Sequence, residues 1–79
     1  MWLKSQNKYN CLINTNNVTA IRNSENSNGF SICADAYKLC EYESEKNRDK
    51  VYGKLESIVI EGKLISYELP EEWELNKED

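Results

Sequence analysis

The residues of this 79-residue chain that could carry out chemistry are three cysteines, a set of carboxylates and two arginines, and histidine is absent. Cys11, Cys33 and Cys40 have irregular spacing and form no C-x-x-C pair, which argues against a disulfide framework and against a zinc site. A cysteine nucleophile would need a neighbouring base, and a Cys–His pair cannot be built here. We therefore interpret the cysteines as reduced, partly buried small hydrophobic residues of a cytoplasmic protein.

The remaining catalytic patterns are also missing. The carboxylate pairs Glu41/Glu43 and Glu71/Glu72 would point to opposite faces of a strand or into water, and so short a chain scarcely encloses a glycosidase cleft. The three glycines are too few and too scattered for a phosphate-binding loop, and there is no G-x-S-x-G. The sequence predicts a protein that is not an enzyme and that uses no cofactor or metal.

Basic and aromatic residues suggest a site for a small anionic nucleotide. Arg48 would lie near the start of a predicted helix, where backbone amides also favour anions. The expected ligand-binding residues are Arg48, Arg22 and Lys38 for phosphate, with Tyr37, Tyr42 or Trp2 stacking on a base. The alternative is that Arg48 and Arg22 are surface charges paired with Glu45 or solvent, and that Trp2 is a core residue.

The acidic end of the chain suggests a different kind of site. Six acids fall between Glu68 and Asp79 against Lys77 alone, and the net charge is −4. This balance argues against broad nucleic-acid binding, which needs a basic stripe. The expected partner-binding residues are Trp73, Glu71, Glu72 and Glu74, which could occupy a basic groove of another protein with Trp73 as anchor. The alternative is a solubilising end whose tryptophan folds back onto its own domain.

The elements that would position these residues are short strands followed by one helix. We expect strands at 2–5, 11–13 and 18–22, a polar loop at 23–29, and strands at 30–34 and 37–42 around the link Asp35-Ala36. If that link is a two-residue turn, one face of the hairpin is the core face and holds Phe30, Ile32, Ala34, Tyr37 and Leu39. The other face holds Ser31, Cys33, Lys38, Cys40 and Tyr42, and is solvated or covered by a second copy.

A helix is predicted for residues 45–60. Ser44 suits the N-cap, Gly62 suits the position after the end, and Val51, Leu55, Ile58 and Val59 follow helical spacing. Residues 63–69 resemble a last strand or arm that ends at Pro70, followed by a short helical turn at 71–75 or a loose end. No apolar run approaches the roughly 18–20 residues that span a bilayer.

The expected fold is α+β, with one antiparallel sheet of four to five strands against a helix in the C-terminal half and an extended C-terminal arm. Residues 1–69 would be a single domain and 70–79 an acidic C-terminal tail. The protein would be a homo-oligomer.

Three stretches resemble a family of small, mostly uncharacterised proteins of Gram-positive bacteria and their phages. They are MWLKSQ, similar to a Met-Trp-(Ile/Leu)-(Lys/Arg)-Ser-Gln start, KLCEYESEKNRDKVYGKLESI, similar to a strand leading into a capped helix, and YELPEE, similar to a Tyr-x-(Met/Leu)-Pro-Glu ending. The chain departs from the family at Cys40, where glycine is usual, and in the short VIEGK segment after the helix. The resemblance implies an accessory protein of a phage or mobile element that counters host defence, acting in the host cytoplasm.

Two mechanisms follow from these expectations. The first is sequestration of a nucleotide immune signal at a dimer interface. The alternative is inhibition of a host nuclease or effector protein through the acidic, tryptophan-containing end.

Overall fold

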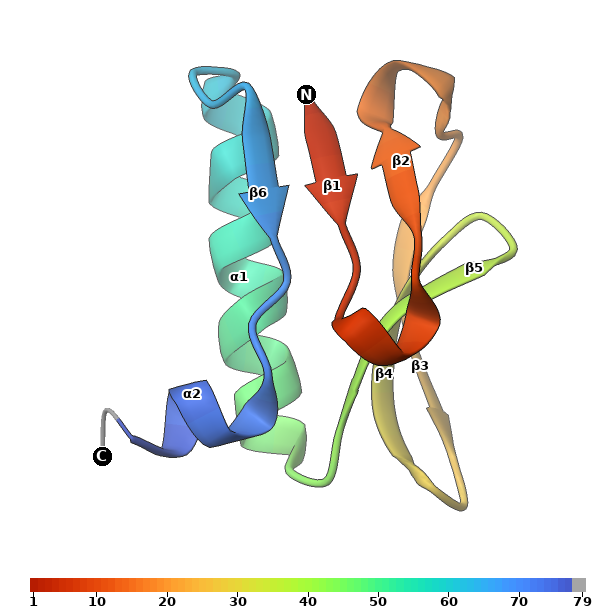
Figure 1. Ribbon diagram of the computed structural model, residues 1–79, viewed down its shortest axis with the longest axis vertical. Coiled ribbons are helices and arrows are strands. Elements are labelled where there is room, and N and C mark those ends of the chain that lie inside the picture. The colour runs from red at the N-terminus through yellow and green to blue at the C-terminus, as the bar shows by residue number, and fades with distance from the viewer. Residues whose placement is uncertain (78–79) are drawn as a thin grey trace.

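Two three-stranded sheets and one main helix make up the computed structural model, which describes residues 1–77 (Figure 1). One sheet has the order β2-β1-β6 and contains β1 (Trp2–Lys4), β2 (Leu12–Asn14) and β6 (Ser66–Glu68). The other has the order β3-β4-β5 and contains β3 (Ile21–Asn26), β4 (Gly29–Ala34) and β5 (Tyr37–Tyr42). Two short 3₁₀ helices, Asn7–Tyr9 and Thr15–Asn17, flank β2.

The α+β class is confirmed, but the expected single antiparallel sheet of four to five strands is wrong, because the strands divide into two sheets. β6 pairs with β1, in the parallel direction, and not with the hairpin strands. Trp2 N donates to Ile65 O at 2.8 Å and Leu69 N donates to Lys4 O at 2.9 Å, which extends this pairing at both ends. The first and last strands of the chain therefore lie side by side (Figure 1).

β3 extends into the segment expected to be a polar loop. It begins at Ile21 and continues to Asn26, and the turn to β4 needs only residues 27–28. β3 has β4 as its one sheet neighbour, so it is an edge strand, and an edge strand tolerates polar side chains. Before it, the Asp35 carboxylate accepts hydrogen bonds from Thr19 N and Ala20 N at 3.0–3.2 Å.

A β-bulge overturns the expected faces of the second hairpin. Asp35-Ala36 forms the two-residue turn, since Ala34 pairs with Tyr37. The register then shifts, so that Cys33 pairs with Lys38 but Ile32 pairs with Cys40. Because one extra residue on β5 reverses the side to which later side chains point, Cys40 and Tyr42 share the core face with their cross-strand partners. Both are buried, at 0% and 1% exposure, and are not on an open second face.

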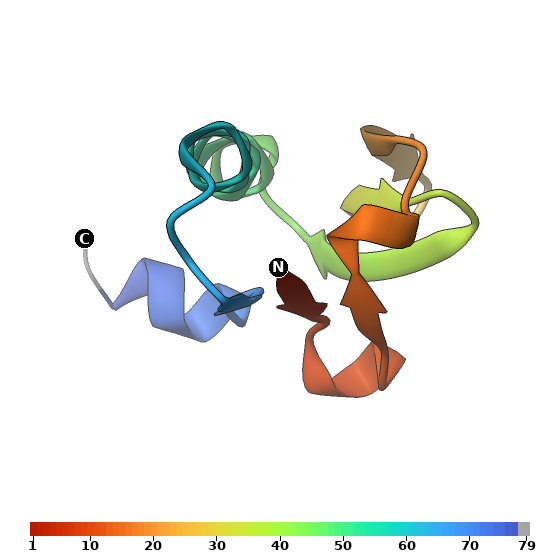
Figure 2. The same cartoon turned by 90° about the horizontal axis from the view of Figure 1, so that it is seen from above.

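The main helix, α1 (Glu45–Glu61), matches the predicted 45–60 closely. Ser44 Oγ accepts a hydrogen bond from Asn47 N at 3.2 Å, and Gly62 has φ +66° while its amide donates to Ile58 O at 3.0 Å. Val51, Leu55 and Ile58 are buried, and α1 packs against β4 and β5. Figure 2 looks along α1 and shows the β3–β4–β5 sheet to one side of it.

The core draws on both sheets, on α1 and on the C-terminal segment. Its members are Leu3, Ile32, Ala34, Leu39, Cys40, Tyr42, Val51, Leu55, Leu69 and Leu75. Leu75 belongs to a short helix, α2 (Glu72–Asn76), that packs against the rest of the fold. Within the stretch expected to be an acidic tail, residues 70–79, Leu75 is a member of this core, and residues 78–79 lie outside the described part. The division into a domain of residues 1–69 and a tail stays a prediction. No helix within residues 1–77 is long and apolar enough to cross a membrane.

Candidate functional site

α2 presents a tryptophan to solvent from a firmly held position. Glu71 is the N-cap, and its amide donates to Glu74 Oε1 at 3.0 Å in a capping box. Leu75 is buried in the core, so the orientation of the helix is set. Trp73 lies on the other side of the helix and 66% of its surface is exposed. Such an exposed aromatic on an ordered element resembles the anchors of protein interfaces.

Glu72 fastens α2 to the start of α1. Its Oε1 accepts a hydrogen bond from Glu43 N at 2.9 Å, and its Oε2 accepts from Ser44 N at 3.2 Å and from Asn47 Nδ2 at 3.0 Å. Partial burial works to raise the pKa of Glu72, but these three donors outweigh it and hold the pKa below its usual value. The carboxylate is therefore ionised at neutral pH, and it holds α2 against the start of α1.

The surface around α2 is hollowed on two sides, and the hollow on the side of Glu72 is acidic. A polar depression of about 540 Å³ is lined by Lys8, Asn28, Glu41, Tyr42, Glu43 and Glu72. A second, more apolar groove of about 590 Å³ is lined by Lys50, Val51, Lys54, Tyr67, Glu68, Pro70, Glu74 and Leu75. α2 contributes Glu72 to the first hollow and Glu74 and Leu75 to the second, so side chains of a partner bound at α2 could enter either one.

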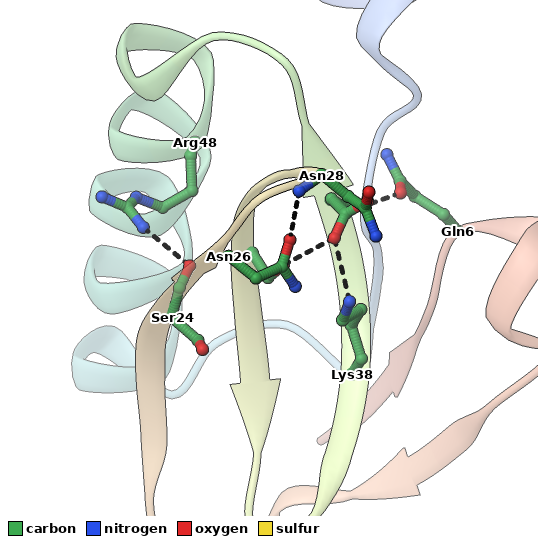
Figure 3. Close-up of polar contacts among 8 residues, drawn as sticks. Gln6, Ser24, Asn26, Asn28, Lys38 and Arg48 are labelled. Carbon is green, nitrogen blue, oxygen red and sulfur yellow. Dashed lines mark hydrogen bonds and ion pairs between the residues drawn. The ribbon is translucent and has the colours of Figure 1, made fainter.

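Arg48 is an interior residue. Its side chain is 6% exposed, and its Nε donates to Asp49 Oδ1 at 2.7 Å. Nη1 donates to Ser24 O at 3.2 Å on β3, as Figure 3 shows, and Nη2 lies 4.0 Å from Glu25 Oε1. The guanidinium stacks over the Phe30 ring at 5.5 Å. Its donors are thus directed at the protein itself, joining α1 to the edge of the β3–β4–β5 sheet.

Of the other expected ligand-binding residues, Arg22, Tyr37 and Lys38 lie near the Asp35-Ala36 end of the β3–β4–β5 sheet, and Tyr42 lies in the core. Tyr42 is buried, its hydroxyl donates to Pro70 O at 2.7 Å, and burial raises its pKa. Lys38 Nζ lies 2.9 Å from Glu41 Oε2, and that hydrogen bond raises the pKa of the lysine (Figure 3). Arg22 is exposed and donates to Asp35 O at 3.3 Å, while Tyr37 is 57% exposed at the start of β5. Tyr42 contributes to the polar depression beside α2, whereas Arg22, Tyr37 and Lys38 line neither of the two hollows described above.

A glutamine not singled out by the sequence joins the two ends of the chain. Gln6 is 5% exposed, its Nε2 donates to Pro70 O at 2.9 Å, and its Oε1 accepts from Glu41 N at 2.9 Å (Figure 3). Pro70 O also receives the Tyr42 hydroxyl. Gln6, Tyr42 and Pro70 come from the three stretches that carry the family resemblance, and here they meet. The resemblance was the one signal that could have drawn attention to Gln6.

The cysteines within the described part of the chain form no disulfide. All three thiols are free, and burial raises the pKa of Cys40 to about 12, so it is held as an inert thiol. No group of three or more cysteine, aspartate or glutamate side chains among residues 1–77 is placed to hold a metal ion.

No protein-family model, curated protein or solved structure matches this chain. The family resemblance therefore stays a prediction.

Proposed function

We propose that this protein acts by binding a partner protein, without catalysing a reaction, and that the acidic end around α2 is the binding surface. The observation that carries the proposal is Trp73, which is 66% exposed on a helix fixed by Glu72 and Leu75. Holding an aromatic side chain ready in solvent lowers the entropy lost on binding. The partner would bury the indole, and its own charge would complement the acids around it.

The charge at this end favours a basic partner. Glu71 and Glu74 accept hydrogen bonds from backbone amides, and neither forms an ion pair within residues 1–77. Glu72 and Glu43 add to the same field around the polar depression. A surface rich in lysine and arginine, such as the nucleic-acid groove of a nuclease, has the opposite charge. The resemblance to phage-associated proteins supplies the setting: a host defence protein inhibited by a small accessory protein.

Sequestration of a nucleotide signal is the less favoured function. It needs Arg48 and Tyr42 in an open pocket, and both are turned to internal partners. Phosphate would have to compete with the Ser24 carbonyl and Asp49 for the guanidinium, and a base could not reach the Tyr42 ring without unfolding the core.

The test is affinity capture from host lysate with three baits: the wild-type chain, Trp73→Ala and Tyr37→Ala. Tyr37 is a matched control, because it is also an exposed aromatic residue but lies on β5. Wild type and Tyr37→Ala should retain the same basic protein, and Trp73→Ala should lose it, with binding weakened as salt is added. Equal capture by all three baits would contradict the proposal, as would thermal stabilisation by cyclic nucleotides that Arg48→Lys removes.

A further inference from the structure

The connection between α1 and β6 exposes an aliphatic surface that the monomer does not cover. Residues 59–66 are all exposed, the longest such run within residues 1–77. Four of the eight are large and aliphatic: Val59 at 42%, Ile60 at 78%, Leu64 at 47% and Ile65 at 84% exposure. Val59 and Ile60 lie in the last turn of α1, which leads into this connection, and Leu64 and Ile65 lie in the connection itself. Four exposed aliphatic side chains within seven residues indicate a contact surface.

The connection is held in a defined shape. Gly62 ends α1 with its amide bonded to Ile58 O at 3.0 Å, and Ile65 O accepts a hydrogen bond from Trp2 N at 2.8 Å. Figure 1 shows this turn at the upper end of the molecule, while α2 lies at the lower end. The surface is therefore ordered and distinct from the proposed binding site.

The residue types that precede Gly62 complement, in reverse order, the residue types that follow it. Residues 59–65 are VIEGKLI, so that two aliphatic residues and a glutamate precede Gly62, and a lysine and two aliphatic residues follow it. A two-fold axis near Gly62 would bring Glu61 of one copy to Lys63 of the other. The same axis would bring Lys63 of the first copy to Glu61 of the second. Neither side chain forms an ion pair within the described part of the chain. In a two-fold interface each patch meets itself, and this one presents opposite charges and apolar groups in matching order.

The area also fits a second copy. The four aliphatic residues expose on the order of 400 Å² per chain, which is the size of the largest apolar patch on a typical monomer, a patch that is often functional. Two copies would cover about 800 Å² of apolar surface, and homodimer interfaces are about 65% apolar. The total interface would then approach about 1,200 Å², the lower limit for stable association.

We propose that the protein is a two-fold symmetric dimer joined through the turn at residues 59–65, with Ile60 and Ile65 at the centre and reciprocal Glu61–Lys63 pairs at the rim. The homo-oligomer expected from the sequence was placed on the second face of the hairpin, where Cys40 and Tyr42 are now buried in the core. The dimer leaves both α2 helices uncovered, and so does not depend on the proposed partner site.

The test is sedimentation equilibrium of the full chain and of charge variants. The wild type should be dimeric, and Glu61→Lys and Lys63→Glu should each weaken the dimer about tenfold by turning both pairs into like charges. An equimolar mixture of the two variants should form a heterodimer as tight as the wild-type dimer, because every Lys then meets a Glu. Lys46→Glu, an exposed charge at the other end of α1, should change nothing.

Substitutions of exposed aliphatic residues test which side chains lie at the centre of the dimer interface. Ile65→Asp should leave a folded monomer, judged by circular dichroism, whereas Leu12→Asp, at an aliphatic residue 66% exposed on β2, should remain dimeric. A wild type that stays monomeric up to about 1 mM would overturn the proposal. A dimer that survives Ile65→Asp, or variants that fail to recover on mixing, would overturn the assigned interface.

Discussion

Arg48 illustrates how a charged side chain can be structural when its guanidinium has partners within the protein. Its guanidinium is buried among Asp49, the Ser24 carbonyl and the Phe30 ring. A buried cation without partners would be costly, and here hydrogen bonds and stacking offset the lost hydration. The helix start that suggested an anion site instead points this residue at the edge of a sheet.

Replacement of Arg48 by alanine should therefore affect stability. We expect Arg48→Ala to lower the free energy of unfolding by about 3 kcal/mol, because packing and hydrogen bonds are lost together. Lys46→Ala, at an exposed lysine on the same helix, should change it by less than about 0.5 kcal/mol. Urea unfolding followed by circular dichroism measures both. An Arg48→Ala variant as stable as wild type would mean that the residue is free for another role.

At the scale of elements, α1 shows two glycines with opposite requirements. Gly62 has φ +66° and closes the helix, while Gly53 lies in the helix interior without a positive φ. An added Cβ would meet nothing within 4 Å at either position. The difference between them is therefore one of backbone conformation and not of space.

Alanine at these positions should shift stability in opposite directions. Gly53→Ala should raise the free energy of unfolding by about 0.5–1 kcal/mol, since alanine restricts the unfolded chain and favours helix. Gly62→Ala should lower it by about 1–2 kcal/mol, because a side chain disfavours the left-handed conformation. Thermal and urea unfolding at a fixed protein concentration will compare the pair. The same sign for both would show that the C-cap conformation is not retained.

At the scale of the whole molecule, the fold depends on closing the C-terminal segment over the N-terminal half. Gln6 binds Pro70, Asn7 N donates to Glu71 Oε1 at 3.3 Å, and Glu72 binds the amides ahead of α1. Residues 70–76 are thus held by contacts with segments far away in the chain. Removing them would unfold part of the core, so single substitutions at Trp73 are the cleaner probe of function.

This closure should depend on pH through Glu72. Its pKa is lowered in the folded state, so its contribution to stability is present above the unfolded-state value of about 4.5 and is lost as pH falls through the folded pKa. We expect the free energy of unfolding to fall below about pH 5, and Glu72→Gln to make that fall shallower. The variant should keep part of the pH dependence of the free energy of unfolding, because the pKa of Glu41 is also lowered, mainly by its hydrogen bond with Lys38. Glu56→Gln, at an exposed carboxylate of α1, should follow the wild-type curve.

The sequence by itself determined the locally encoded features. The helix ends follow from Ser44 and Gly62, because capping involves hydrogen bonds to residues only a few positions away. The α+β class and the turn at Asp35-Ala36 follow from the spacing of the strand and helix patterns, although Asp-Ala is a weak match to the usual two-residue turns. The acidic, histidine-free composition likewise restricts the chemistry without any knowledge of contacts.

Only the tertiary structure decided which surfaces are open. One extra residue in β5 turned Cys40 and Tyr42 into the core, and the parallel pairing of β6 with β1 divided the sheet. Arg48 and Glu72 became internal contacts, whereas Trp73 and the 59–65 turn remained exposed. Which side chains are buried depends on which distant segments of the chain pair and in what register. That pairing is set by all contacts of the fold together, and not by the local sequence of any one segment.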